Sequence, residues 1–162
     1  MKHLSAIFER ILGTICAVLL GAMVVVVFGQ VIMRYVLRMP FSWGEELARF
    51  LQIWLTFMGA SFAFLVGGHA SIQMLLDRLP EKARRMTRVA IALLSGLFFL
   101  ILLVKGMRLA LFTWSDESPA LSLPFGIVYL ALPVASLLIF LTQARDIWQL
   151  VHPDGGRDRE SV

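Results

Sequence analysis

Four long apolar runs constrain this chain more than any other feature of its sequence. Their lengths predict helices at about 11–33, 43–66, 87–111 and 125–148. At about 1.5 Å per residue, roughly 20 apolar residues in a helix cross a hydrocarbon core of about 30 Å. The sequence therefore predicts an all-α, polytopic membrane protein whose four transmembrane helices form a bundle.

Length and composition favour a single membrane domain. Of the 162 residues, 59% are hydrophobic and 16% are charged, which is more apolar than a typical soluble domain. We expect residues 1–152 to form the four-helix membrane domain and residues 153–162 to form a polar cytoplasmic tail. Four helices with short connections leave no room for a separate catalytic or nucleotide-binding module.

The distribution of Lys and Arg predicts the orientation. Ten of the 15 basic residues fall at the N-terminus, at the C-terminus or between the second and third runs. Because cytoplasmic loops carry an excess of Lys and Arg, both termini are expected in the cytoplasm. The basic residues also gather at the ends of apolar runs, where anionic lipid headgroups are the expected neighbours. The net charge of +4 therefore indicates membrane lipid and not nucleic acid as a partner.

Charged side chains cluster where the first run ends and the second begins. Arg34 follows the first run, and Glu45, Glu46 and Arg49 lie in the first turns of the second. A helix would place Arg49 beside either carboxylate, because it lies four residues after Glu45 and three after Glu46. Two interpretations remain open: a solvated helix end with local ion pairs, or a docking site for a partner protein.

Small residues recur at a spacing that favours close helix packing. On the first helix they are separated by multiples of four residues, and a shorter pair follows on the second, although glycine and alanine are common in membrane helices generally. Pro133 should kink the fourth helix, and we interpret it as a packing feature. The candidate packing residues are Gly13, Ala17, Gly21, Gly29, Gly59, Ala63 and Pro133.

Nothing in the sequence predicts catalysis, a metal or a cofactor. His69 has no second ligand at a suitable spacing, and the single cysteine, Cys16, lies within an apolar run. The four runs carry no ionisable residue near their midpoints, where a transporter would bind an ion or substrate. We therefore expect neither an enzyme nor a self-contained transporter.

Two stretches of the sequence have a distinctive order and spacing of residues. The first comprises Arg34-Tyr35, Pro40, Trp43, Glu45-Glu46, Arg49, Trp54, Gly59-Ala60 and Gly67-Gly68-His69. The second comprises Ser118-Pro119, Leu121, Pro124 and Tyr129-Leu130-Ala131-Leu132-Pro133. Together they resemble the small membrane subunit, of DctQ type, of tripartite ATP-independent periplasmic (TRAP) transporters. One departure is Ala70-Ser71 after His69, where the family commonly has isoleucine directly after the histidine.

The resemblance implies a subunit in the bacterial inner membrane that scaffolds a large multi-helix transport subunit. A periplasmic binding protein would deliver an organic anion, a carboxylate or sugar acid, and a sodium gradient would drive uptake. It also implies that certain residues hold the outer helix ends or contact partners. These candidates are Arg34, Tyr35, Trp43, Glu45, Glu46, Arg49, Trp54 and His69.

Two functions of other classes remain as alternatives. A self-sufficient four-helix exporter would need a carboxylate within the membrane, and the apolar runs contain none near their midpoints. The second alternative is a structural membrane assembly protein unrelated to transport. Only the family resemblance distinguishes the transporter subunit from it.

Overall fold

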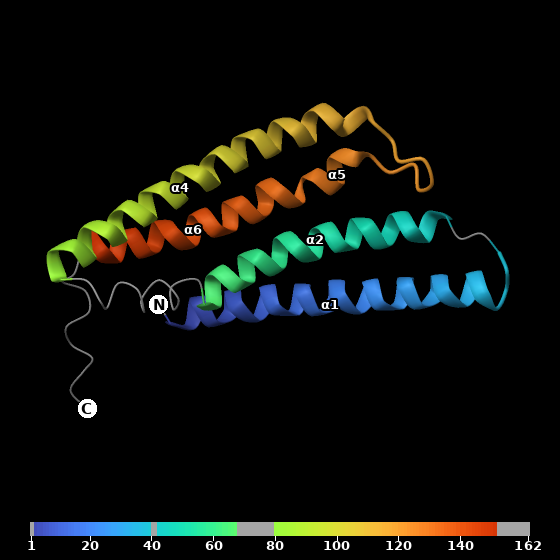
Figure 1. The fold of residues 1–162 in the computed structure, drawn as a ribbon, viewed down its shortest axis with the longest axis horizontal. Helices are drawn as coiled ribbons and strands as arrows, with labels where there is room; N and C mark the ends of the chain where they lie inside the picture. Colours follow the sequence, from blue (N-terminus) through green and yellow to red (C-terminus); the bar gives the residue numbers. More distant parts are fainter. Residues whose placement is uncertain (1, 40–41, 68–79, 152–162) are drawn as a thin grey trace.

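Four long helices make up most of the computed structural model, which describes residues 2–39, 42–67 and 80–151 (Figure 1). Four spans are long and apolar enough to cross a membrane: Ile7–Tyr35, Ser42–Val66, Met86–Ser115 and Phe125–Ala144. The predicted all-α class with four membrane-crossing helices is confirmed. The helices are α1 Lys2–Tyr35, α2 Ser42–Gly67, α4 Glu81–Phe112, α5 Phe125–Tyr129 and α6 Ala131–Val151, with a 3₁₀ turn, η1, at Thr113–Ser115.

The helices form a row, in the order α1, α2, α6 and α4 (Figure 1). The extensive contacts join α1 to α2, α2 to α6, and α6 to α4. Burial agrees, since 39% of the most apolar window of the fourth span is buried, against 6% for the spans of α1 and α4. Helix α6 is therefore central, and α1 and α4 are the two edges.

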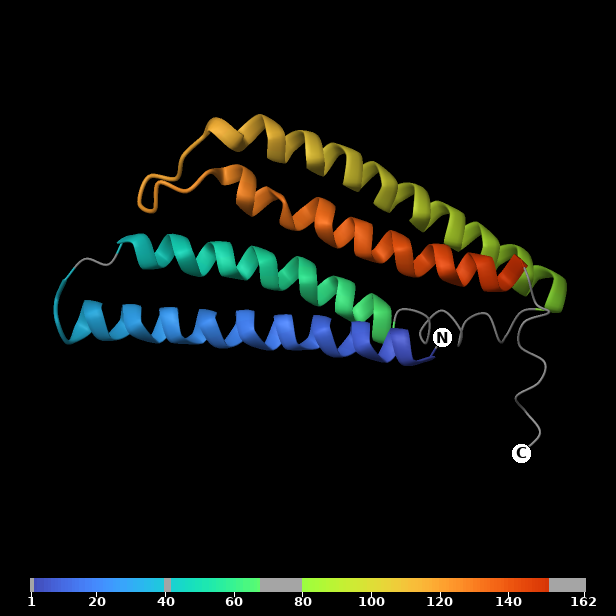
Figure 2. The ribbon, with the colours of Figure 1, turned by 180° about the vertical axis from the view of Figure 1, so that it is seen from behind.

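Both inter-helix connections that the structure describes lie at one end of the row (Figure 2). They are the segment 36–39 after α1 and the segment 113–124 between α4 and α5. We call this end the loop end. Helix α1 begins and α6 ends at the opposite end, as expected for two antiparallel hairpins.

Aromatic and polar contacts join the two hairpins through α2. Phe50 of α2 meets Phe125 edge to face with ring centroids 6.0 Å apart, and Phe64 meets Phe99 of α4 at 5.5 Å. Between these contacts, the buried hydroxyl of Ser61 lies 3.3 Å from the backbone oxygen of Ala135 on α6. The same hydroxyl lies 3.0 Å from the oxygen of Phe57 in its own helix, so it can share one proton between the two acceptors.

Two glycines lie in crowded positions where α4 meets α5 and α6. A Cβ atom placed on Gly106 would lie 3.0 Å from the side chain of Leu132 and 3.1 Å from that of Pro133. A Cβ on Gly126 would lie 2.6 Å from the backbone oxygen of Ala110 and 2.7 Å from the ring of Trp114. Glycine at these two positions is thus what allows the backbones to pack so closely.

The fourth span is interrupted ahead of Pro133. Helix α5 ends at Tyr129, Leu130 forms a turn, and α6 begins at Ala131. Proline has no backbone N–H, so Pro133 cannot donate to the carbonyl of Tyr129 four residues earlier. The neighbouring bonds persist, from Leu130 N to Gly126 O at 3.0 Å and from Val134 N to Leu130 O at 3.1 Å. Pro133 is fully buried, so the interruption lies inside the protein.

Gly126→Ala should destabilise the fold. The added methyl group would meet the backbone of Ala110, which cannot move aside as a flexible side chain can, and overpacking of this kind costs about 1–3 kcal/mol. The free energy of unfolding, measured by thermal denaturation in mild detergent, should fall by that amount. Gly59→Ala is the matched control, because a Cβ there meets nothing within 4 Å. Equal stability of the two variants would contradict the packing described above.

Candidate functional site

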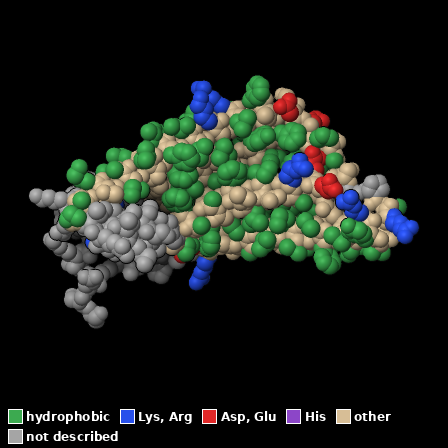
Figure 3. All heavy atoms as spheres, in the orientation of Figure 1, with side chains coloured by type: hydrophobic (Ala, Val, Ile, Leu, Met, Phe, Trp, Pro, Cys, Tyr) green, Lys and Arg blue, Asp and Glu red, His purple; other side chains and the backbone are tan. Residues whose placement is uncertain are grey.

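Most of the charged and aromatic candidates lie near the loop end, at the end of α1 and in the first turns of α2. The turn after α1 brings Arg34 and Tyr35 near the start of α2, which carries Trp43, Glu45 and Glu46. Hydrophobic side chains cover much of the broad face of the row in Figure 3, while most of its visible acidic side chains lie toward the loop end. The loop end is therefore the polar part of this face.

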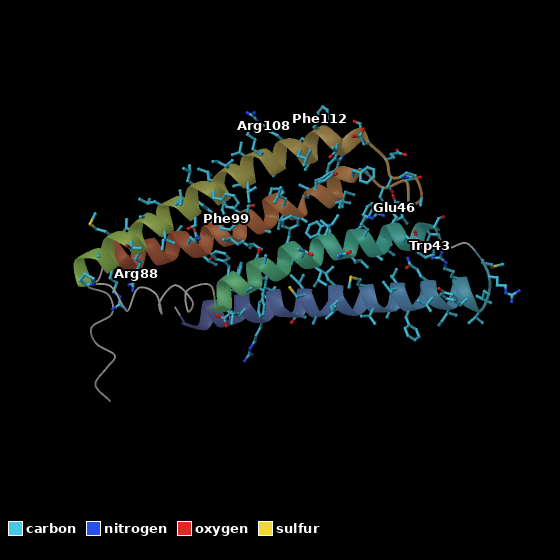
Figure 4. The ribbon with its side chains drawn as sticks, in the orientation of Figure 1. Trp43, Glu46, Arg88, Phe99, Arg108 and Phe112 are labelled. Carbon is cyan, nitrogen blue, oxygen red and sulfur yellow. The ribbon has the colours of Figure 1, made fainter. Side chains whose placement is uncertain are left out.

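Glu46 ties α2 to the connection between α4 and α5. Its Oε2 accepts hydrogen bonds from the backbone N–H groups of Ala120, at 3.0 Å, and Leu121, at 2.9 Å. The side chain lies on the part of α2 that faces this connection (Figure 4). Bonds from amides to a carboxylate are charge-assisted and stronger than neutral ones. A half-buried Glu46 thus holds the loop ends of the two hairpins together.

The connection that Glu46 holds is itself hydrogen-bonded. Ser118 N donates to Leu123 O at 2.9 Å, Ser122 N donates to Ser118 O at 3.0 Å, and Phe125 N donates to Asp116 O at 2.8 Å. Ser122 adopts a φ of 52°, the left-handed region that non-glycine residues seldom enter. The segment 116–125 is therefore a compact turn that presents its amides to α2.

Arg34 and Glu45 make a second, weaker link between α1 and α2. Arg34 Nη1 lies 4.0 Å from Glu45 Oε1, and both side chains are about 70% exposed, at 74% and 69%. An ion pair so open to water adds little stability. Arg49 is exposed and has neither carboxylate within salt-bridge distance among the described residues. The expected pairing of Arg49 with Glu45 or Glu46 is thus not formed, because Glu46 is engaged by the loop amides.

The aromatic candidates differ in their surroundings. Tyr35 is 75% exposed and Trp43 is 45% exposed, both at the loop end. Trp54 is half-buried, nearer the middle of α2. His69 lies outside the described residues. The loop-end pair resembles the aromatic residues that anchor membrane proteins at the interface with water.

The small residues selected on α1 and α2 only partly face another helix of this chain. A Cβ on Gly13 would lie 3.4 Å from the ring of Phe62 on α2. The same atom on Gly21, Gly29 or Gly59 would meet nothing within 4 Å outside the local helix. Ala17 and Ala63 are exposed. The role of these small residues in close helix packing stays a prediction.

Sequence reasoning identifies Glu46 as a candidate, but it predicts neither the groups that Glu46 binds nor the two crowded glycines. Glu46 was selected, but its acceptor role for amides 74 and 75 residues away was not foreseen. Gly106 and Gly126 were not selected, although both are glycines within or beside apolar runs, which was an available signal. Within the described residues no cluster of three His, Cys, Asp or Glu side chains could hold a metal ion.

The matching family and the similar proteins agree with each other. Residues 23–152 match the family described as tripartite ATP-independent periplasmic transporters, DctQ component. The sialic acid TRAP transporter small permease protein SiaQ of Vibrio cholerae is 27% identical over 151 residues, which cover 93% of this chain and 87% of that one. A Haemophilus influenzae protein provisionally described as a TRAP transporter small permease is 29% identical, with 86% of each chain covered.

Similarity also extends to a longer permease. The sialic acid TRAP transporter permease protein SiaT of Haemophilus influenzae is 29% identical over 143 residues, which are 86% of this chain but 22% of that protein. Other relatives carry names that specify C4-dicarboxylate, isethionate or ectoine. Proteins similar to this one thus occur both as separate small permeases and as part of a larger permease chain.

Glu46→Ala should loosen the connection between α4 and α5. Loss of a charge-assisted bond worth about 1.5–3 kcal/mol should speed amide hydrogen exchange at Leu121 roughly tenfold to hundredfold. Hydrogen exchange followed by mass spectrometry of the 116–125 peptide would measure it. Glu45→Ala is the control, since its contact with Arg34 is long and exposed. Unchanged exchange in Glu46→Ala would show that the carboxylate does not hold the turn.

Proposed function

Since this chain belongs to the DctQ family of tripartite ATP-independent periplasmic (TRAP) transporter components, we propose that it scaffolds the large transport subunit of one such system. The observation that carries the proposal is the family match over residues 23–152, most of the chain. The match of this chain to 22% of SiaT supports it, because in that relative the similar region shares one polypeptide with the rest of a permease. The two edges of the row, α1 and α4, each leave one side uncovered, and such a surface is suited to contact with a larger subunit.

Uptake by the complete system draws on an ion gradient in this proposal. The family description calls these transporters ATP-independent, so accumulation of a solute needs another source of energy. We assign that source to sodium and the sodium site to the large subunit. The four spans of this chain support that division, since their middle sections carry hydroxyl groups, such as those of Ser61, Ser95 and Ser136, and no carboxylate.

The transported solute is an organic anion in this proposal, a carboxylate or a sugar acid. Relatives named for sialic acid and C4-dicarboxylate support that class. Relatives named for isethionate and ectoine share comparable identity, 29% in each case. The small subunit therefore does not itself select the solute, and a periplasmic binding protein delivers it.

The loop end would face the periplasm, with both termini in the cytoplasm. The excess of Lys and Arg at the termini and between the second and third runs supports this orientation. Arg34, Tyr35, Trp43, Glu45, Glu46 and Arg49 would then lie where the binding protein approaches. Glu46 stabilises this surface from within, and exposed Arg49 is available to contact the partner.

A reporter fusion tests the orientation. Green fluorescent protein fused after Val162 should fluoresce, because it folds in the cytoplasm, and alkaline phosphatase fused there should be inactive. The matched control places each reporter after Ser115 in a truncated chain, where the activities should be reversed. An active phosphatase at Val162 would place the C-terminus outside and contradict the orientation.

Copurification and charge reversal test the function itself. A tag on this chain should recover a large multi-helix membrane protein in comparable amount from native membranes in mild detergent. Arg49→Glu should leave that recovery intact but lower capture of the binding protein and uptake about tenfold, since it reverses a charge at the proposed contact. Arg10→Glu, at the opposite end of the molecule, is the control.

Two results would contradict these proposals separately. Recovery of the tagged chain alone, or as a homo-oligomer, would favour the small exporter and overturn the scaffold role. Unchanged uptake and unchanged capture of the binding protein in Arg49→Glu would overturn only the contact at the loop end.

A further inference from the structure

Two cations lie on the outer edge of the row, within a membrane span. Lys105 and Arg108 are exposed on α4 and belong to the span Met86–Ser115. They are three residues apart, so they share one side of the helix. Arg108 and Phe112 point away from α6, off the edge of the row (Figure 4). Neither cation has a carboxylate of the described residues within salt-bridge distance.

The cations belong to a continuous side of α4 that no other described helix covers. The opposite side packs on α5 and α6 through Gly106 and Ala110. On the open side Phe112 is 82% exposed, the highest value among the exposed large hydrophobic residues. We define the α4 outer face as Leu94, Phe98, Ile101, Lys105, Arg108 and Phe112. These residues follow one another at alternating intervals of four and three residues.

The other edge of the row carries charges only near the ends of its span, because Glu9, Arg10 and Arg34 lie within four residues of an end of Ile7–Tyr35. Helix α1 exposes Val18, Val25 and Phe28 among others, and the sequence from Ile11 to Met33 carries no charged residue. Lipid chains alone can cover that surface. The two edges of the row are therefore different, and the difference is the pair of cations on α4.

The depth and direction of Lys105 favour a fixed anion over a lipid headgroup. Lys105 lies ten residues, about 15 Å, before Ser115 in a span of 30 residues, about 45 Å long, so with the span centred on a core of about 30 Å it lies roughly 7 Å inside that core. Cα–Cβ bonds in a helix tilt toward its N-terminus, so this side chain starts out away from the nearer end of the span. Reaching the headgroups would mean folding back against that direction. A carboxylate at the same depth would balance the charge directly.

We propose that the α4 outer face binds the large membrane subunit through a transmembrane helix that places a carboxylate against Lys105 and Arg108. This inference rests on the proposed function, which supplies the partner. The apolar members of the face would pack on that helix, and the charge pairing would set its register. The edge formed by α1 then faces lipid.

Photocrosslinking in the complete transporter tests which edge is covered. The photoreactive residue p-benzoylphenylalanine replaces Phe98 or Ile101 on the α4 outer face, with the large subunit expressed alongside. Both positions should crosslink to the large subunit. Val25 on α1 is the matched control, because it is 72% exposed within the other edge and should not crosslink to that subunit.

Charge reversal tests the role of the cations. Lys105→Glu with Arg108→Glu should lower the large subunit recovered per tagged chain about tenfold or more, because it sets like charges against each other. The double variant Lys105→Arg with Arg108→Lys should retain recovery. An acidic residue of the large subunit next to the crosslinked position, changed to Lys, should restore binding to the reversed chain.

The outcomes separate this inference from the function on which it rests. If the unaltered chain recovers no large subunit, the proposed function fails and this inference fails with it. If recovery is normal but crosslinks form only from Val25, or from Phe98 and Ile101 only to lipid, the α4 outer face is not the interface. Normal recovery by the reversed double variant would also overturn it. The crosslinking result stands even if that variant does not accumulate in the membrane.

Discussion

Away from their ends, the helices of this chain pack against one another in an apolar solvent, where the hydrophobic effect adds little to helix association. Close backbone approach and a few hydrogen bonds must therefore hold the row together. Gly126 against the carbonyl of Ala110 and the Ser61 hydroxyl near Ala135 O supply such contacts around α6. At the loop end, the Glu46 carboxylate joins the hairpins through two loop amides. The central position of α6 follows from these interactions.

The helices could be predicted from the sequence because lipid leaves an unbroken apolar run few alternatives. The contacts between them could not. The spacing of Glu46 and Arg49 predicted a local ion pair, but the carboxylate instead binds amides 74 and 75 residues away, which no local pattern encodes. Likewise the regular spacing of small residues on α1 predicted close packing there, whereas the tight contacts are at Gly106 and Gly126. Which glycine is crowded depends on the neighbouring helix.

The arrangement also explains why so much apolar surface remains open. A row buries its middle helix and leaves both outer helices mostly exposed, as the 39% and 6% buried shares show. In a membrane one such edge can face lipid while the other meets a partner, and among the described residues only the α4 edge carries exposed cations well inside its span, Lys105 and Arg108. This division suits the proposed scaffold role, in which one edge of the row binds the large subunit.

The proposed scaffold role requires that this chain keep one conformation while the transporter works. Spin labels at Ser42 on α2 and Ser115 beside α4, in a chain with Cys16→Ala, would report the distance between the two hairpins at the loop end. Double electron–electron resonance on the assembled transporter should give one narrow distance distribution, the same with and without sodium. A distribution that shifts or splits when sodium is added would mean that the hairpins move against each other, and would contradict the scaffold role.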